Sequence, residues 1–522
     1  MHQTQLSTPI SPLSSSEDSK DITKLATGAS VSLVGKVGGI FIQILSQVFL
    51  ARFLGPELFG LYAIGWTILR MASRIATLGL DKGVLRFAPI YWKKDDAGLK
   101  GTILQSITYA FGAGLMIGGI LFVSSPWLAN QVFKKSDLLN VFHWTAIALP
   151  FATTLYVAEA ATRVSQRMKY SIYAEQISQP LGNLILFIVF FFLGWKILGA
   201  MVAVALSFFI ALIIALSYIK LLFPEAFSLQ VKQKTIIRTM IVFSLPASLA
   251  SLFSQFNTWV DRLLVGYFLS LSEAGIYQAV SQSSIVFLII LSAFGAIFAP
   301  MIVDLYYKKE NERLNEVFKV STKWCFYVCL PICLGICFVA RDFMIALFGH
   351  EYIEGSLPLI ILTTGQIMNV GSGIIGLLLI MTEQTRNWLI FSGIALLVNV
   401  ILNSIFIPVW GISGAALGTT CAIGGLFVAG LILVKNRLDA WPFDKRYLKG
   451  LFAAGVTLIF LFILNRFEIN IPFLSVGITM VVSILVFILT LFTLGLENED
   501  KELMRIITGR IVGLISSVHS HL

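Results

Sequence analysis

Long apolar stretches follow one another along almost the whole chain, separated by short polar connections. A helix needs about 20 apolar residues to cross the roughly 30 Å hydrocarbon core of a bilayer. On that criterion the sequence predicts fourteen transmembrane helices, near residues 26–53, 57–78, 102–124, 139–162, 173–193, 197–220, 240–267, 273–299, 320–340, 355–381, 387–407, 411–434, 448–465 and 472–495. No connection is long enough to fold as an enzyme domain. We therefore expect an all-α integral membrane protein that is not an enzyme.

Composition and charge support this class. The mean hydropathy is +0.86 and 13% of the 522 residues are charged, against about 25% in soluble domains. The formal charge of +10 does not indicate nucleic acid, because in a membrane protein the position of Lys and Arg matters more than their sum. Most of the 38 basic residues fall on one side of the predicted helices. The positive-inside rule then places both termini in the cytoplasm, with the chain crossing the cell membrane many times.

The sequence contains an internal repeat. Residues 53–62 (FLGPELFGLY) match residues 268–277 (FLSLSEAGIY) without gaps at an offset of 215. Two more pairs of segments match at the same offset: 91–94 with 306–309, and 191–200 with 406–415. Each unit would hold six helices, and because six is even the two units enter the membrane from the same side. We therefore predict two parallel six-helix repeats followed by two extra C-terminal helices.

Domain boundaries follow from these spans. The predicted parts are a disordered cytoplasmic tail (1–23), an N-lobe of six helices (24–222), a cytoplasmic linker (223–238), a C-lobe of six helices (239–437), the last two helices (445–495) and a cytoplasmic tail (496–522). Residues 501–518 of that tail place apolar side chains along one face and basic side chains near the other. This pattern predicts an amphipathic helix in the cytoplasmic interface.

Apart from residues within three positions of a predicted helix end, four basic residues lie inside the predicted spans: Lys36, Arg70, Arg74 and Arg262. A cation at mid-bilayer costs about 2.5–3.5 kcal/mol on insertion scales, so each needs a partner, a wet cavity or an escape to the interface. Arg70 and Arg74 are four residues apart and therefore share a helix face. We predict that these four residues bind an anionic substrate. The structural alternative is a side chain that reaches the interface or pairs with another helix.

Three further charged residues are candidates for gating or coupling. Asp261 precedes Arg262, but sequence neighbours on a helix point in different directions, so they are not simply an ion pair. Glu159 and Arg163 have the spacing of an intrahelical salt bridge, which is the structural alternative for them. The five cysteines offer no metal site, since four of them are spread along about 18 Å of one helix. We predict neither a metal nor a cofactor.

Residues 48–87 resemble the first helix hairpin of the polysaccharide transporters in the multidrug/oligosaccharidyl-lipid/polysaccharide (MOP) flippase superfamily, the Wzx-type flippases. The matching features are the turn at Leu54, Gly55, Pro56 and Glu57, the residues Gly60 and Tyr62, and the segment Gly79, Leu80 and Asp81. In the second half, Asp261 and the sequence AGIYQAV (274–280) extend the resemblance. It covers roughly residues 24–437.

The resemblance implies two six-helix lobes that form a V around a central cavity, which opens alternately to each side. It also implies an alternating-access flippase that exports polyprenyl-diphosphate-linked oligosaccharide, a precursor of polysaccharide or O-antigen. The expected partners are this lipid-linked glycan, membrane lipids and glycan polymerase or ligase machinery, and we expect a monomer.

Three alternatives stay open. A MATE-like cation-coupled drug antiporter of the same superfamily would need carboxylates in its cavity. A membrane glycan polymerase or transferase would need a large outer loop with catalytic residues. A membrane scaffold would transport nothing.

Overall fold

A computed structural model describes residues 15–165, 170, 172–228, 230–466, 471–495, 497 and 499–501, without the side chains of residues 15–34, 36, 37, 174, 175, 247 and 250. All regular elements in these ranges are helices. The first helix begins at Ser15, inside the segment predicted as a tail, and the rest of that segment lies outside the described residues. The predicted amphipathic helix 501–518 also lies outside them, except for its first residue.

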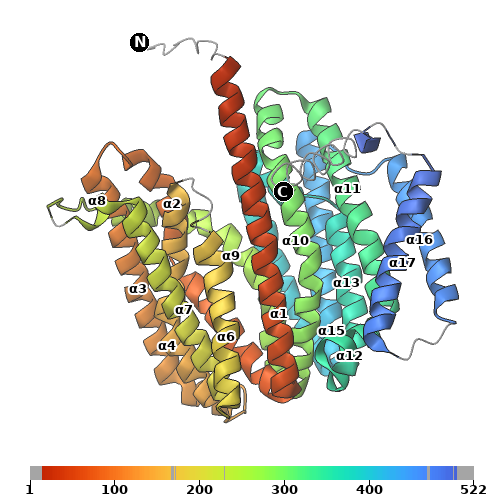
Figure 1. Cartoon of the computed structure of the whole chain (residues 1–522), viewed down its shortest axis with the longest axis horizontal. Coiled ribbons are helices and arrows are strands. Elements are labelled where there is room, and N and C mark those ends of the chain that lie inside the picture. The colour runs from red at the N-terminus through yellow and green to blue at the C-terminus, as the bar shows by residue number, and fades with distance from the viewer. Residues whose placement is uncertain are drawn as a thin grey trace, which may run out of the picture.

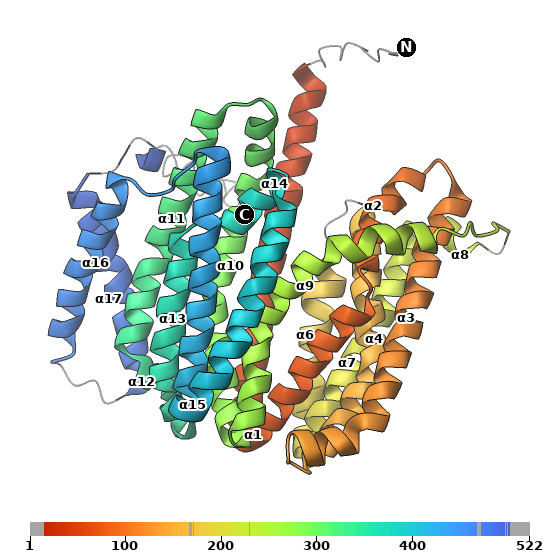
Figure 2. The same cartoon turned by 180° about the vertical axis from the view of Figure 1, so that it is seen from behind.

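The helices form two bundles that stand side by side in Figures 1 and 2. The first part of the chain contains α1 (Ser15–Ala76), α2 (Leu80–Tyr91), α3 (Asp96–Trp127), η1 (Leu128–Val132), α4 (Leu138–Val164), η2 (Tyr173–Ser178), α6 (Gln179–Phe192), α7 (Lys196–Leu222) and α8 (Pro224–Phe227). The second part contains α9 (Ile237–Phe268), α10 (Leu271–Tyr307), α11 (Asn311–Phe338), α12 (Ala340–Phe348), η3 (His350–Gly355), α13 (Ser356–Gly371), α14 (Ile375–Met381), α15 (Thr385–Leu438), α16 (Lys445–Leu464) and α17 (Pro472–Thr493). Helices α16 and α17 lie at the outer edge of the second bundle (Figure 1).

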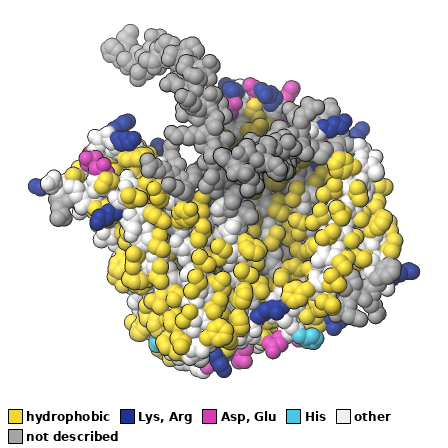
Figure 3. All heavy atoms as spheres, in the orientation of Figure 1, with side chains coloured by type: hydrophobic (Ala, Val, Ile, Leu, Met, Phe, Trp, Pro, Cys, Tyr) yellow, Lys and Arg dark blue, Asp and Glu magenta, His cyan; other side chains and the backbone are white. Residues whose placement is uncertain are grey.

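The helices are those of a multi-pass membrane protein. Ten helices of the described chain are long and apolar enough to cross a membrane, or eleven if the two halves of bent α9 count as one span. Hydrophobic side chains cover the lateral face seen in Figure 3, and charged side chains gather at its upper and lower edges. This arrangement keeps charge out of the hydrocarbon core. The all-α membrane fold is thereby confirmed.

Two of the predicted helix boundaries coincide with glycines that turn the backbone without a loop. The spans predicted at 26–53 and 57–78 are two helices that follow one another directly in α1 and are separated by a kink at Gly55 (φ 72°). Helix α15 likewise joins two predicted spans across Gly411 (φ 58°). Glycine alone adopts positive φ at no steric cost, so a tight reversal fits within one continuous element.

The two bundles meet where α1 bends, at the bottom of Figures 1 and 2. A Cβ atom added to Gly60 would overlap the carbonyl oxygen of Leu271, and one added to Gly275 would overlap that of Pro56. Both pairs of equivalent residues are 215 positions apart, so the contact is reciprocal, as between units related by a two-fold axis. Glycine is required at both positions because the two backbones touch.

Side chains from both bundles also close this end by donating to backbone carbonyls. The Arg52 Nε donates to the carbonyl of Leu347 at 2.7 Å. The Lys135 Nζ donates to the carbonyl of Leu269 at 2.5 Å. These charge-assisted bonds fasten α1 to α12 and the end of η1 to the end of α9.

The opposite end is bridged by the first part of α9, which lies against α2 and α3 of the first bundle. Helix α9 bends by 59° between Ile237–Pro246 and Ser251–Phe268. The Ile237 N–H donates to Gln105 Oε1 on α3 at 3.1 Å. Gly79, before α2, packs directly on the backbone of Ser244. The two bundles are therefore in contact at both ends.

A buried cation on α11, three residues from the start of the predicted span 320–340, holds the C-terminal segment. Lys323 is 1% exposed, and its Nζ lies 2.7 Å from Asp500 Oδ1, which also accepts from Trp324 Nε1 at 2.8 Å. Burial alone would raise the pKa of Asp500, but the hydrogen bonds from Lys323 and Trp324 hold it below its usual value. A carboxyl group with a lowered folded-state pKa stabilises the fold above about pH 4 and loses this contribution at lower pH.

Gly60→Ala is expected to lower the stability of the protein, because the added methyl group would overlap the backbone of Leu271. Overpacking of this kind costs about 1–3 kcal/mol. The loss of monodisperse protein on heating in detergent, followed by size-exclusion chromatography, measures the effect. Gly119→Ala is the matched control, since an added Cβ there meets no atom within 4 Å. Equal melting temperatures for the two variants would contradict the reciprocal contact.

Lys323→Met is expected to destabilise the protein by about 3–5 kcal/mol, the range for breaking one partner out of a buried ion pair. Lys319→Met provides the comparison, because the Lys319 pair with Glu316 is more exposed and such pairs contribute about 0–1 kcal/mol. The difference in melting temperature between Lys323→Met and the unaltered protein should be the same at pH 7 and pH 5, because the pKa of Asp500 lies below this range. A loss no larger than that of Lys319→Met would show that the pair with Asp500 is unimportant.

Candidate functional site

A polar cavity of about 110 Å³ lies within the first bundle, between α1, α4, η2, α6 and α7. Its lining residues are Gly39, Gln43, Arg70, Arg74, Leu155, Tyr156, Glu159, Gln176, Gln179, Pro180 and Phe208. The ionisable acids and bases among them are two arginines and one glutamate, so the lining carries a net positive charge. The structure therefore brings Arg70, Arg74 and Glu159 together.

Aromatic rings hold both guanidinium groups inside the bundle. Arg70 and Arg74 follow one another by about one turn of α1, and Tyr156 of α4 contacts both. The Arg70 Nη1 donates to the Tyr156 hydroxyl at 3.3 Å, and the Arg74 guanidinium lies 3.7 Å from the centre of the Tyr156 ring. Arg70 also lies 4.8 Å from the centre of the Trp66 ring. These contacts lie within the bundle, and a role of both arginines in binding substrate stays a prediction.

Within the part of the chain that the structure describes, these two arginines are not paired with a carboxylate and can therefore bind an anion. Among the ion pairs of the described residues, none includes Arg70 or Arg74. The Arg74 Nε is buried without a hydrogen-bond partner. A buried donor left unpaired costs about 1–3 kcal/mol, so an acceptor that entered the cavity would recover this energy.

Glu159 and Arg163 end α4 beside this cavity. Glu159 is 4% exposed and lines the cavity, whereas Arg163 does not line it. Both residues have interaction partners. Their gating or coupling role stays a prediction.

Lys36 lies on α1 three residues before Gly39, which lines the cavity. Its side chain lies outside the described residues. An added Cβ at Gly39 would lie 2.5 Å from the Gln176 carbonyl oxygen, so α1 runs close against η2 here. The backbone therefore places Lys36 about one turn from the cavity.

Arg262 does not join Arg70 and Arg74 but lies with Asp261 in the last turns of α9. Asp261 is 3% exposed and Arg262 is 5% exposed. The Asp261 carboxylate accepts from the Tyr277 hydroxyl at 2.7 Å, from Thr419 Oγ1 at 3.2 Å and from the Arg262 backbone N–H at 2.8 Å. In the described part of the chain the two side chains form no ion pair within 4.0 Å. The Arg262 Nε is buried and unpartnered.

Hydrogen bonds between side chains continue from this region across the interface between α1 and α10. The Gln278 Nε2 donates to Gln47 Oε1 at 3.4 Å, and the Gln47 Nε2 donates to the Tyr62 hydroxyl at 3.5 Å. Gln47 is 215 positions before Arg262, so the first repeat has a neutral amide where the second has a guanidinium.

Sequence reasoning missed the neutral residues of the cavity, above all Tyr156. A signal was present, because Tyr156 is three residues before Glu159 and therefore shares its helix face. Gln43, Gln176 and Gln179 come from other elements, and their approach depends on tertiary packing. A search for charged residues alone could not find them.

Comparison with known proteins identifies the family. A family model described as "Polysaccharide biosynthesis protein" matches residues 25–306, more than half of the chain. The chain belongs to this family. This match confirms the predicted resemblance to a polysaccharide biosynthesis family.

Individual relatives are more distant. The "Probable low-salt glycan biosynthesis flippase Agl15" of Haloferax volcanii is 27% identical over 182 residues, which cover 35% of this chain and only 39% of that protein. The "Succinoglycan biosynthesis transport protein ExoT" of Rhizobium meliloti is 22% identical over 462 residues, 84% of this chain and 87% of ExoT. Among solved structures, "Lipid II flippase MurJ, inward closed conformation" has a TM-score of 0.72 at 16% identity, covering 88% of this chain and 97% of that one. At this identity the likeness shows the fold.

Asp261→Asn is expected to lower the melting temperature, because Arg262 would lose the negative charge beside it. Leaving a buried charge uncompensated costs about 3–5 kcal/mol. The double variant Asp261→Asn with Arg262→Gln should recover most of the loss, since glutamine is neutral and occupies the equivalent position of the first repeat. The same heating assay measures both. If the double variant melts no higher than Asp261→Asn, charge compensation is not what Asp261 provides.

Proposed function

We propose that this protein is an alternating-access flippase that moves a polyprenyl-diphosphate-linked oligosaccharide from the inner to the outer leaflet. The observation that carries this proposal is the cavity in which Arg70 and Arg74 lie against aromatic rings without a carboxylate partner. A diphosphate would supply the missing acceptors, and hydrogen bonds between guanidinium and phosphate are short and strong. Their low-dielectric surroundings strengthen the attraction further.

The topology that we propose has fourteen spans with both termini in the cytoplasm. Dividing α1 and α15 at Gly55 and Gly411 and counting the shorter apolar helix at Gln176–Phe192 brings the eleven candidate spans to this number. The reciprocal contact of Gly60 and Gly275 supports two equivalent six-helix lobes at 24–222 and 239–437. The segment 445–495 then adds two helices at the edge of the second lobe.

Alternating access would require the two bundles to separate at one end at a time. At one end the bonds that must open are those of Arg52 and Lys135 to the carbonyls of the other bundle. At the other end, the first part of α9 must leave α2 and α3. We propose that Asp261 couples these movements, since it connects α9 to α10 and α15 through Tyr277 and Thr419.

The charge of the cavity distinguishes this proposal from a cation-coupled drug antiporter. An antiporter of cationic drugs would need more carboxylates than basic groups in its cavity. The lining of this cavity has one carboxylate, Glu159, and two guanidinium groups, Arg70 and Arg74. We also propose that the protein acts as a monomer on a lipid-linked glycan and passes it to a glycan polymerase or ligase.

Arg70→Ala and Arg74→Ala are each expected to slow transport of the lipid-linked glycan about tenfold to a hundredfold, because a hydrogen bond to a charged group contributes about 1.5–3 kcal/mol. The measurement uses proteoliposomes and follows the appearance of the glycan at the outer leaflet with a membrane-impermeant lectin. Arg70→Lys should retain part of the transport activity that Arg70→Ala loses, because lysine keeps the positive charge but not the bidentate hydrogen-bonding geometry of arginine.

Arg313→Ala is the control for loss of an arginine, since the Arg313 side chain is 74% exposed and far from the cavity in sequence. Transport by Arg70→Ala and Arg74→Ala at the control rate would remove these residues from the substrate site. Absence of transport by the unaltered protein would favour a scaffold.

A further inference from the structure

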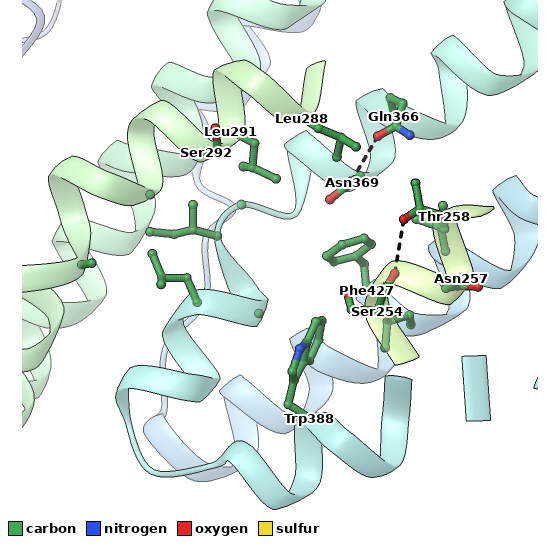
Figure 4. Close-up of a pocket in the computed structure, with 18 of the residues that line it drawn as sticks. Ser254, Asn257, Thr258, Leu288, Leu291, Ser292, Gln366, Asn369, Trp388 and Phe427 are labelled. Carbon is green, nitrogen blue, oxygen red and sulfur yellow. Dashed lines mark hydrogen bonds between the residues drawn. The ribbon is translucent and has the colours of Figure 1, made fainter. Parts of the chain in front are cut away.

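A second cavity lies in the second bundle, between α9, α10, α13, α14 and α15 (Figure 4). Its volume is about 510 Å³, within the range of about 300–1,000 Å³ that is usual for ligand pockets. Nothing in the function proposed above uses it. None of its lining residues belongs to the Arg70 cavity.

No ionisable side chain lines this cavity. An anion that entered it would find no cation, and a cation would find no carboxylate, so either would pay the cost of desolvation without compensation. The polar groups of the lining are amides, hydroxyls and one indole. Those that matter most are Asn257, Gln366, Asn369 and Trp388. The chemistry of the lining therefore favours an uncharged ligand.

Asn369 supplies an unused hydrogen-bond acceptor. The residue is 4% exposed, its Nδ2 donates to Gln366 Oε1 at 3.1 Å, and its Oδ1 is buried without a partner. Figure 4 shows this oxygen turned toward the cavity. A ligand that pairs with it must bring an O–H or N–H donor. A hydrocarbon chain cannot do this and would leave the acceptor unpaired.

Aromatic rings also line this space. The rings of Trp388 and Phe427 have centroids 6.4 Å apart and project into the cavity in Figure 4. Trp388 is 7% exposed, so its ring is fixed by packing. A lining that combines aromatic faces with amides matches a molecule that has an apolar face and a rim of hydroxyl groups.

We propose that this cavity binds a neutral sugar ring of the lipid-linked glycan. The proposal rests on the function proposed above and gives the glycan a site separate from that of the diphosphate. The C–H face of the sugar packs on Trp388 and Phe427, and a sugar hydroxyl donates to Asn369 Oδ1. Ser292 on α10 is exposed and lines the cavity, which gives the ring a way in.

Asn257 on α9 relates the cavity to Asp261, one turn away on the same helix. Asn257 lines it and accepts a hydrogen bond from Asn399 Nδ2 at 2.6 Å. Asp261 follows Asn257 by about one turn of α9 and contacts Tyr277 of α10. A single substrate with its diphosphate at Arg70 and its sugar near Asn369 would therefore contact both bundles.

The test is a binding experiment with purified protein in lipid nanodiscs and two radiolabelled probes. One probe is the polyprenyl-diphosphate-linked oligosaccharide extracted from cells that carry the protein, and the other is polyprenyl diphosphate without sugar. Asn369→Leu removes the acceptor, and Ser292→Phe fills the cavity from its exposed side. Ile297→Phe is the control, because Ile297 is 58% exposed on the same helix and does not line the cavity.

We expect Asn369→Leu and Ser292→Phe to weaken binding of the glycan-bearing probe at least tenfold and to leave the sugar-free probe unchanged. The Ile297→Phe variant should bind both probes like the unaltered protein. If Asn369→Leu or Ser292→Phe weakens the binding of both probes equally, the proposal is overturned in favour of a site for the lipid chain. No weakening of either would overturn it in favour of a cavity that holds only water.

A further variant separates this proposal from that of the diphosphate site. Arg70→Ala should weaken the binding of both probes to the same extent. If Arg70→Ala changes neither probe while Asn369→Leu still weakens only the glycan-bearing one, the diphosphate site fails and the sugar site stands. If the unaltered protein binds neither probe, both proposals fail. Melting temperatures close to that of the unaltered protein establish that each variant is folded.

Discussion

A cation in a low-dielectric interior must be compensated, and the rest of this structure depends on how each buried cation is compensated. Lys323 is compensated by Asp500, and the pair fixes the C-terminal segment to α11. Arg262 lies beside Asp261, whose carboxylate is engaged with Tyr277 and Thr419. Arg70 and Arg74 are held by aromatic rings, which stabilise a cation without neutralising it. Only this last form of compensation leaves positive charge available to a ligand.

The second constraint is the contact of backbones where the bundles meet. Because Gly60 and Gly275 carry no Cβ, α1 and α10 approach each other closely at this end. The contact is the same from both sides, because the residues that touch are equivalent in the two repeats. The charge-assisted hydrogen bonds of Arg52 and Lys135 are better suited than the glycine contact to stabilise one conformation, because a modest rotation of the bundles breaks them.

The hydrophobic pattern was sufficient to predict the membrane class and the approximate position of most helices, because apolar length is read directly from the sequence. It also separated the spans on either side of Gly55 and Gly411, where a single residue turns the backbone. Gly55 and Gly411 turn the chain inside continuous elements, and no polar loop marks either turn. For the candidate site, charge inside a predicted span indicated Arg70 and Arg74, which share one cavity, but it gave no indication of Tyr156, which contacts both. Lys323 was missed because it lies at the edge of a span, where burial depends on how the C-terminal segment folds back.

The neutral cavity was missed for a related reason, and its position explains how one substrate could act on both bundles. An amide within an apolar helix is inconspicuous in a sequence, although several meet around Asn257 and Asn369. The two cavities differ in charge: the one in the first bundle has guanidinium groups and a carboxylate beside its amides, whereas the one in the second bundle has amides and an indole but no ionisable side chain. A ligand that carries only a diphosphate or only sugars would interact with one bundle. It would bind equally well in either relative position of the two bundles. A ligand that carries both gains its full binding energy only in the arrangement that brings both sites within its reach, and that difference in affinity is what shifts a conformational equilibrium.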